Sequence, residues 1–158
     1  MKIRLLAVGA LSNPHLKALC EDYARRIPRL VPFEILEVKD GKAQSGDKRL
    51  ITEAETLRRK GEAGAEGPLS GWAAWDAVGD AFSSEALAAW LSQREKENTR
   101  VLTWVIGSSH GLDPAFKKSC DFRLSLGPMT FTHEMARFLV LEQLYRALSI
   151  QRHLPYHH

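Results

Sequence analysis

The sequence has few of the features that identify exported or membrane-embedded proteins. It contains only two cysteines, Cys20 and Cys120, which are too few for a disulfide framework and are expected to be buried thiols. No stretch approaches the roughly 20 apolar residues that cross a membrane, and the first residues do not resemble a signal peptide. We therefore expect a protein of the reducing cytoplasm with no membrane partner.

Motifs for the common phosphate and metal sites are also missing. Gly9 alone follows the first apolar segment, so there is neither a Gly-x-Gly-x-x-Gly fingerprint nor a Walker sequence. The six histidines, at positions 15, 110, 133, 153, 157 and 158, lack the spacing of zinc ligands. These absences predict that no metal is bound and that a ligand site lies late in the chain.

Basic residues outnumber acidic residues only slightly. The formal net charge is +3 and the pI is about 9.0, a mild basic bias that fits a polyanionic partner without requiring one. We interpret the basic run Arg58-Arg59-Lys60 as a solvated helix end rather than an RNA contact. With 158 residues, of which 44% are hydrophobic, the chain is expected to form a single domain spanning 1–158.

Apolar periodicity alternates between strand-like and helix-like segments. Strands are expected at 2–8, 33–38, 72–75, 101–106 and 122–126. Helices are expected at 14–26, at 48–61, from Ser83, from Asp113 and at 132–150. Polar or glycine-bearing segments at 40–47 and 61–71 are expected to be loops. This order predicts an α/β fold with a mainly parallel sheet and helices on both faces.

The last predicted helix is unusual because it is apolar on most of its circumference. Its apolar residues are Met135, Phe138, Leu139, Leu141, Leu144, Tyr145 and Leu148. An ordinary surface helix has a single apolar stripe. We interpret the additional apolar surface as contact with a second copy of the chain, and expect a homodimer that a charge at Leu141 would weaken.

Glycines follow the later strands. Gly79, Gly107, Gly111 and Gly127 each come soon after a predicted strand, and Pro128 stiffens the last of these loops. Because the carboxyl ends of parallel strands meet at one edge of a sheet, these loops are expected to enclose a ligand crevice. Backbone groups closing around an apolar planar ligand, such as an adenosyl group, fit this pattern.

Several of these segments carry a resemblance to a known family. They include Lys2-Ile3-Arg4-Leu5-Leu6-Ala7-Val8-Gly9, Asp76-Ala77-Val78-Gly79, Met129-Thr130-Phe131-Thr132-His133, Leu141-Glu142-Gln143-Leu144-Tyr145-Arg146-Ala147 and Pro155-Tyr156-His157. At these spacings the chain resembles, over essentially its whole length, the RlmH-type ribosomal RNA large-subunit pseudouridine methyltransferases of the SPOUT class.

The resemblance implies a C-terminal trefoil knot, in which residues 124–131 are threaded through the chain before the last helix, and a homodimer. It implies S-adenosyl-L-methionine as the cofactor and N3 of a pseudouridine in 23S ribosomal RNA, on the assembled ribosome, as the methyl acceptor. The family's cofactor positions fall on Trp75, Gly107, Leu126, Gly127, Pro128, Met129, Thr130 and Phe131.

Two positions depart from the family pattern. The family has Ile-Gly-Gly-x-x-Gly where this chain has Ile106-Gly107-Ser108-Ser109-His110-Gly111. Ser108 is expected to crowd the ligand if its position needs positive φ, or else to donate a hydrogen bond to it. Trp75 stands where the family usually has Leu, which is expected to change the packing on the adenine side.

The implied reaction requires loss of the N3 proton, by a base or with donors that stabilise the resulting negative oxygens. Under the resemblance His157 and Arg146 are the candidates, with Tyr156 as a positioning group. Arg146 is equally well explained by an ion pair with Glu142 at i,i+4 spacing, and His157 by a frayed tail. His133 is interpreted as a first-turn residue of the last helix.

Two other functions remain open from the residues alone. One is an RNA-binding module that has lost methylation, which the change at Ser108 suggests. The other is an α/β enzyme that uses a different adenine ligand. For the tail, residues 152–158, we expect ordering over the cofactor crevice, in the same or the partner subunit, when RNA binds.

Overall fold

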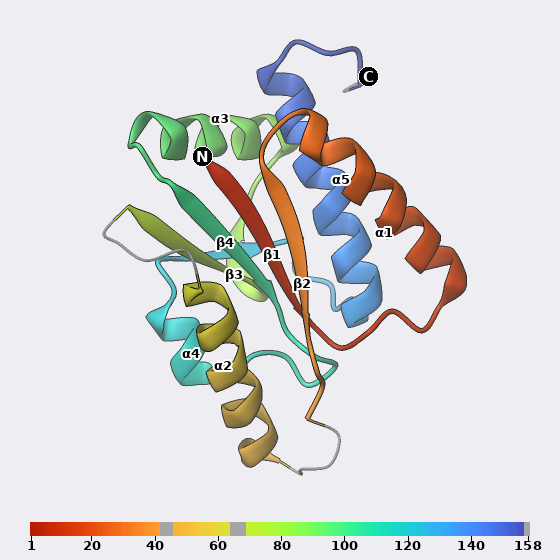
Figure 1. The fold of residues 1–158 in the computed structure, drawn as a ribbon, viewed down its shortest axis with the longest axis vertical. Coiled ribbons are helices and arrows are strands. Elements are labelled where there is room, and N and C mark those ends of the chain that lie inside the picture. Colours follow the sequence, from red (N-terminus) through yellow and green to blue (C-terminus); the bar gives the residue numbers. More distant parts are fainter. Residues whose placement is uncertain (42–45, 64–68, 157–158) are drawn as a thin grey trace.

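The computed structural model describes residues 1–41, 46–63 and 69–156. Its elements, in chain order, are β1 (Lys2–Val8), α1 (Pro14–Arg26), a 3-10 turn η1 (Ile27–Arg29), β2 (Phe33–Val38), α2 (Asp47–Glu62), β3 (Ser70–Ala81), α3 (Ser84–Lys96), β4 (Val101–Ile106), α4 (Pro114–Ser119), β5 (Phe122–Ser125) and α5 (His133–Gln151). The strands form one sheet in the order β2-β1-β4-β3-β5, and every pair is parallel. Helices α1, α3 and α5 lie on one face, and α2 and α4 on the other (Figure 1).

The predicted fold class is therefore confirmed. The predicted bounds of β1, β2 and β4 are confirmed, and those of α1, α2, β5 and α5 agree to within a residue at each end. The predicted loops at 40–47 and 61–71 lie partly outside the described residues. We infer that residues 1–158 form one domain, because all described strands join the same sheet. The knot that the resemblance implies stays a prediction.

The central strands of a parallel sheet are covered by helices on both faces, and their residues are therefore largely apolar. All six residues of β4 are buried, as are all but the first residue of β1. Alternate side chains serve opposite layers: Leu5 packs in the core under α1 and α5, whereas Leu6 packs in the core that includes Leu57 of α2. Among the described residues, no helix is both long and apolar enough to cross a membrane.

Side-chain caps fix the starts of α1, α3, α4 and α5. Asn13, Ser83, Asp113 and Thr132 each accept backbone N–H bonds from the first turn that follows. Such caps satisfy donors that an isolated helix end leaves unpaired. The helix starts expected at Ser83 and Asp113 are thereby confirmed, and both residues are N-caps.

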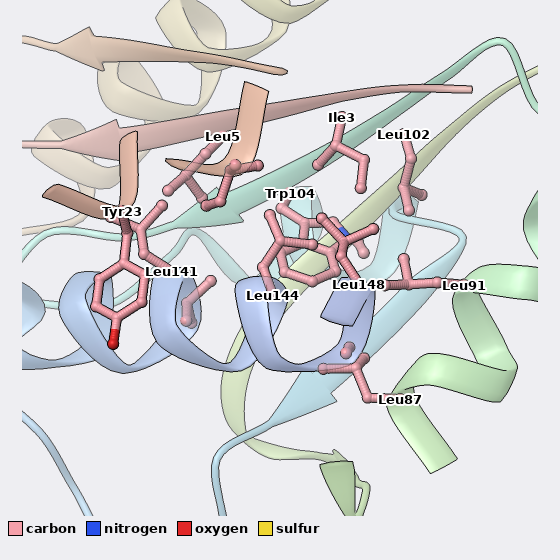
Figure 2. Close-up of a cluster of buried hydrophobic side chains, with 14 of the residues drawn as sticks. Ile3, Leu5, Tyr23, Leu87, Leu91, Leu102, Trp104, Leu141, Leu144 and Leu148 are labelled. Carbon is pink, nitrogen blue, oxygen red and sulfur yellow. The ribbon is translucent and has the colours of Figure 1, made fainter. Parts of the chain in front are cut away.

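The apolar circumference of α5 is covered largely from within the chain. Helices α1 and α3 both pack against α5 (Figure 1), and Leu141, Leu144 and Leu148 are almost completely buried between α5 and the sheet (Figure 2). Leu141 is 0% exposed, so its expected use as a dimer-interface probe is wrong. A charge at Leu141 would disrupt the core of each subunit, and not its contact with another.

Candidate functional site

A cavity of about 890 Å³ opens where β3, β4 and β5 end and α5 begins. Every residue that the resemblance assigns to the cofactor lines this cavity except Pro128, which lies between Gly127 and Met129 in the same loop. The wall also contains residues that sequence reasoning missed, namely Ser12, Asn13, Leu16 and Glu134. The position agrees with the rule that ligands of open parallel sheets bind at the carboxyl ends of the strands.

The loop after β4 is a tight turn built on two glycines. A Cβ at Gly107 would lie 2.4 Å from the carbonyl oxygen of Gly111, so only glycine fits there. Gly111 has a φ of +80°, and its N–H donates to the Ser108 carbonyl at 2.9 Å. These contacts bring the backbone of residues 107–111 to the cavity wall without bulky side chains.

Ser108 fits this turn without strain. Among the described residues other than glycine, only Asn98 and His153 have positive φ, so the expected crowding from a left-handed Ser108 does not occur. Ser108 is buried, and its hydroxyl accepts the N–H of His110 at 3.3 Å. The hydroxyl therefore stabilises the turn, and the departure from the family pattern leaves the cavity intact.

Strand β3 is longer than predicted and carries a bulge beside the cavity. Trp75 and Asp80 both pair with Leu124 of β5, so residues 76–79 leave the ladder, and we call them the β3 bulge. Gly79 lies inside β3 rather than in a loop after it. A Cβ there would meet the Leu124 backbone at 2.6 Å, so Gly79 is needed for close approach to β5.

An ion pair anchors the β3 bulge. Asp76 accepts from Lys117 of α4 at 2.5 Å, and both side chains are only partly buried. Burial raises the pKa of Asp76, but the Lys117 ammonium and nearby backbone N–H groups outweigh it and hold the pKa below its usual value. The carboxylate is therefore charged at neutral pH.

The indole of Trp75 forms an apolar part of the cavity wall. It packs edge-to-face against Trp104, with ring centroids 5.1 Å apart. Its buried N–H has no hydrogen-bond partner among the described residues. The substitution of Leu by Trp thus adds a flat aromatic surface to the cavity wall.

The start of α5 is joined to the loop after β1 by a carboxylate that the sequence did not identify. Glu134 accepts from the Ser12 hydroxyl and, at 3.0 Å, from the Asn13 N–H. The Ser12 hydrogen bond contributes most to lowering the pKa of Glu134. His133 is the first residue of α5, as interpreted, and its ring also lines the cavity.

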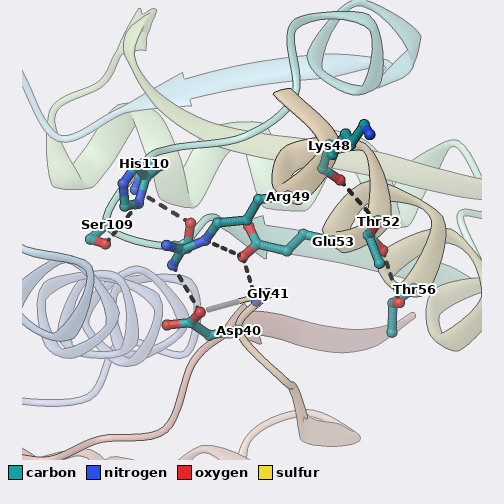
Figure 3. A network of polar contacts seen from close by, with 10 residues as sticks. Asp40, Gly41, Lys48, Arg49, Thr52, Glu53, Thr56, Ser109 and His110 are labelled. Atoms are coloured by element: carbon teal, nitrogen blue, oxygen red, sulfur yellow. Dashed lines mark hydrogen bonds and ion pairs between the residues drawn. The ribbon is translucent and has the colours of Figure 1, made fainter. Parts of the chain in front are cut away.

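A second polar network supports the opposite face of the sheet. Arg49 of α2 donates to Asp40 at 2.8 Å and to Glu53 at 3.1 Å (Figure 3). Glu53 also accepts the N–H of Gly41 at 2.9 Å, which attaches the segment after β2 to α2.

A further hollow of about 730 Å³ lies between α2 and α4, away from the cofactor positions.

Arg146 and Tyr156, two of the three predicted catalytic residues, lie at the other end of α5. Arg146 pairs with Glu142 at 2.7 Å, as the i,i+4 spacing predicts. Tyr156 shares a 2.7 Å hydrogen bond with the hydroxyl of Tyr23 and packs edge-to-face on Tyr145. Burial, and then the Tyr23 hydrogen bond, raise the pKa of Tyr156 well above its usual value. His157 lies outside the described residues.

This cluster is far from the cavity of its own chain. His133 and Arg146 lie thirteen positions apart in one continuous helix, which at its normal rise of 1.5 Å per residue separates them by about 20 Å. Residues 152–156 fold back on α1 and α5, through the Tyr156 contacts and a hydrogen bond from Arg152 to the Leu30 carbonyl. In this structure residues 152–156 lie against this end of α5, and not over the cavity.

No metal site accompanies the cavity in the part of the chain that the structure describes, since no group of three or more His, Cys, Asp or Glu side chains is close enough to hold an ion. The arrangement defines an α/β protein with a ligand cavity at the carboxyl edge of a parallel sheet.

Comparison with known proteins gives the family. A family model described as predicted SPOUT methyltransferase matches residues 1–157. A ribosomal RNA large subunit methyltransferase H from Syntrophotalea carbinolica is 42% identical over 99% of both chains. One of the same name from Pelobacter propionicus is 38% identical over 100% of both. The chain belongs to the SPOUT methyltransferase family.

A solved structure supports the fold independently. The crystal structure of a probable methyltransferase from Bordetella pertussis Tohama I has a TM-score of 0.54, covering 93% of this chain and 96% of that one. Its 19% sequence identity limits the likeness to the fold.

Proposed function

We propose that the protein is an S-adenosyl-L-methionine-dependent methyltransferase of large-subunit ribosomal RNA. The observation that carries this proposal is the cavity of about 890 Å³, which is lined by the residues that match the family's cofactor positions. A volume of this size is typical of small-molecule sites. The names of the full-length relatives support ribosomal RNA as the substrate. The finer assignment, N3 of a pseudouridine in 23S RNA on the assembled ribosome in the cytoplasm, rests on the sequence resemblance.

The residues of the cavity suit an adenosyl ligand. Trp75, Leu126 and Phe131 offer apolar surface for the adenine and ribose. Gly107 and Gly127 add no side chain to the cavity wall, so backbone groups can approach the ligand closely at these two positions. When bound, the cofactor supplies an electrophilic methyl group for in-line displacement, a reaction in which positioning provides much of the acceleration.

Arg146 and Tyr156 are suited to the acceptor base rather than to the cofactor. The Glu142 carboxylate raises the pKa of Arg146, so the guanidinium stays charged and can stabilise the oxygens of a deprotonated uracil-like ring. Tyr156, with its raised pKa, is a hydrogen-bond donor at neutral pH. This leaves His157 as the candidate base.

We further propose that two subunits build one active site, because the Arg146 cluster and the cavity lie at opposite ends of α5. A homodimer would bring the cluster of one subunit to the cavity of its partner. Leu19 of α1 and Met135 of α5 are 45% and 37% exposed and are better interface probes than the buried Leu141. Sedimentation should give a dimer at micromolar concentration, and a clean monomer would contradict this proposal.

The alternative of an RNA-binding module without methylation loses its main support, since Ser108 does not obstruct the cavity. Calorimetric titration of the protein with S-adenosyl-L-methionine, and with ATP as a comparison, tests the proposed function against both alternatives. Micromolar binding of S-adenosyl-L-methionine, with methyl transfer to ribosomes lacking the modification, is expected. Absence of binding, or tighter binding of ATP, would refute it.

A further inference from the structure

One buried hydroxyl contacts both the β3 bulge and the loop 126–131, two segments of the cavity wall. Ser125, the last residue of β5, is 7% exposed. Its Oγ accepts the N–H of Gly127 at 3.0 Å and lies 3.2 Å from the carbonyl oxygen of Ala77 and 3.1 Å from that of Gly127. A hydroxyl has one proton, so it donates to one of these carbonyls at a time. Ser125 thereby connects the β3 bulge to the loop 126–131.

The β3 bulge needs such support because it has left the sheet. Trp75 and Asp80 share Leu124 as a partner, so the residues between them lack regular ladder bonds to β5. Val78 at the tip is 81% exposed and contributes little packing. On the side away from β5 the β3 bulge is contacted by α4, where Lys117 binds Asp76 at 2.5 Å.

We infer that Ser125 and Lys117 are positioning residues that hold the β3 bulge against the loop 126–131 and so set the width of the cofactor cavity. Neither residue lines the cavity, so neither needs to touch the cofactor or the RNA. The inference rests on the proposed function, because it takes the cavity to be the S-adenosyl-L-methionine site. Loss of either contact lets the bulge move away from Gly127, and binding must then restore the closed arrangement.

A serine pair provides the first test. Ser125→Ala removes the connecting hydroxyl, whereas Ser149→Ala removes another buried hydroxyl, which donates to the Tyr145 carbonyl within α5. Ser125→Ala should raise the Kd and KM for S-adenosyl-L-methionine by about tenfold, the equivalent of one lost hydrogen bond. Its kcat at saturating cofactor should stay within about twofold, because the reacting groups are unchanged. Ser149→Ala should leave the cofactor Kd as in the unaltered protein.

A lysine pair gives a second test that does not depend on a buried position. Lys117→Met removes the charge that holds Asp76, and Lys118→Met changes the next, exposed residue of α4. Lys117→Met should weaken cofactor binding severalfold and Lys118→Met should not. The double variant Ser125→Ala/Lys117→Met should show non-additive losses, since both contacts act on one bulge.

The outcomes separate the inference from the function on which it rests. If the unaltered protein binds S-adenosyl-L-methionine and both Ser125→Ala and Lys117→Met bind it equally well, the inference is overturned and the proposed function stands. If Ser125→Ala does not fold by circular dichroism, Lys117→Met alone decides. A fall in kcat at unchanged KM would also overturn the positioning role. Failure of the unaltered protein to bind would overturn both.

Discussion

Replacing Gly127 by valine should abolish cofactor binding while leaving the fold intact. Gly127 lines the cavity and has a φ of +116°, a conformation that residues with a Cβ rarely adopt. A Cβ there would meet no atom within 4 Å, so the substitution causes no direct clash with the protein. Its effects are backbone strain and a branch in open space at the ligand site.

The magnitude follows from what binding must restore. In the free variant the loop can relax to negative φ, giving up the 3.0 Å bond from the Gly127 N–H to Ser125. Returning to the native loop costs about 1–3 kcal/mol of backbone strain, in addition to about 1 kcal/mol for the hydrogen bond. A total of about 2–4 kcal/mol corresponds to a loss of affinity of about 30- to 1,000-fold, before any overlap between the branch and the ligand.

The assay is calorimetric titration with S-adenosyl-L-methionine, accompanied by circular dichroism. Gly46→Val is the matched control, since Gly46 has a φ of +60°, a Cβ there also meets nothing within 4 Å, and the residue lies at the start of α2, outside the cavity lining. The control should bind the cofactor normally. Unchanged affinity in Gly127→Val, with its helical signal preserved, would place the cofactor elsewhere.

Two further outcomes are expected. Deleting residues 155–158 should leave cofactor affinity nearly unchanged, because Tyr156 lies far from the cavity of its own chain. The same deletion should reduce methylation of ribosomes by orders of magnitude, and methylation at the full rate would show the tail to be dispensable. Cys20 and Cys120 should react with a disulfide reagent at pH 8 about 100-fold more slowly in the folded than in the unfolded protein, because burial raises both pKa values from 9.0 to about 11. Their reaction should accelerate as the pH rises toward 11, and equal rates in the two states would contradict the burial of these thiols.

The central strands could be predicted because local pattern and tertiary position agree there. Strands β1 and β4 are mostly apolar and almost entirely buried, as is typical of the central strands of a parallel sheet covered on both faces. The end of β3 could not be predicted in the same way. Asp76, Gly79 and Asp80 have the composition of a turn, but their conformation depends on pairing with Leu124, which is distant in sequence.

Glycines illustrate the same ambiguity within the site and outside it. Gly61 marks the start of a loop by composition, but it lies in the last turn of α2, where a Cβ would be 2.1 Å from the Trp72 ring. Gly127 and Gly111, by contrast, have the positive φ that turn glycines usually provide. Sequence alone does not distinguish a glycine needed for close packing from one needed for its backbone conformation.

The part of the cavity wall that the loops after β4 and β5 form could be predicted from the sequence. The part that the loop after β1 forms could not. Glu134 reaches Ser12 and Asn13 across 122 and 121 positions of sequence. In a helix start, a glutamate is already explained by the favourable charge of the helix dipole. Nothing in its local pattern therefore indicates that it joins the loop after β1 to the cavity.

The length of α5 is the reason for proposing that two subunits build one active site. Resemblance gathers Gly127, Arg146 and Tyr156 into one active site, but α5 runs without a break from His133, which lines the cavity, to Arg146, and this fixes these two residues about 20 Å apart in one subunit. Arg146 is held in place by Glu142, and Tyr156 by Tyr23 and Tyr145, so the cluster has its own rigid support. Movement of the tail alone would bring Tyr156 but not Arg146 toward the cavity. A second subunit that presents its own cluster satisfies both requirements without unfolding α5.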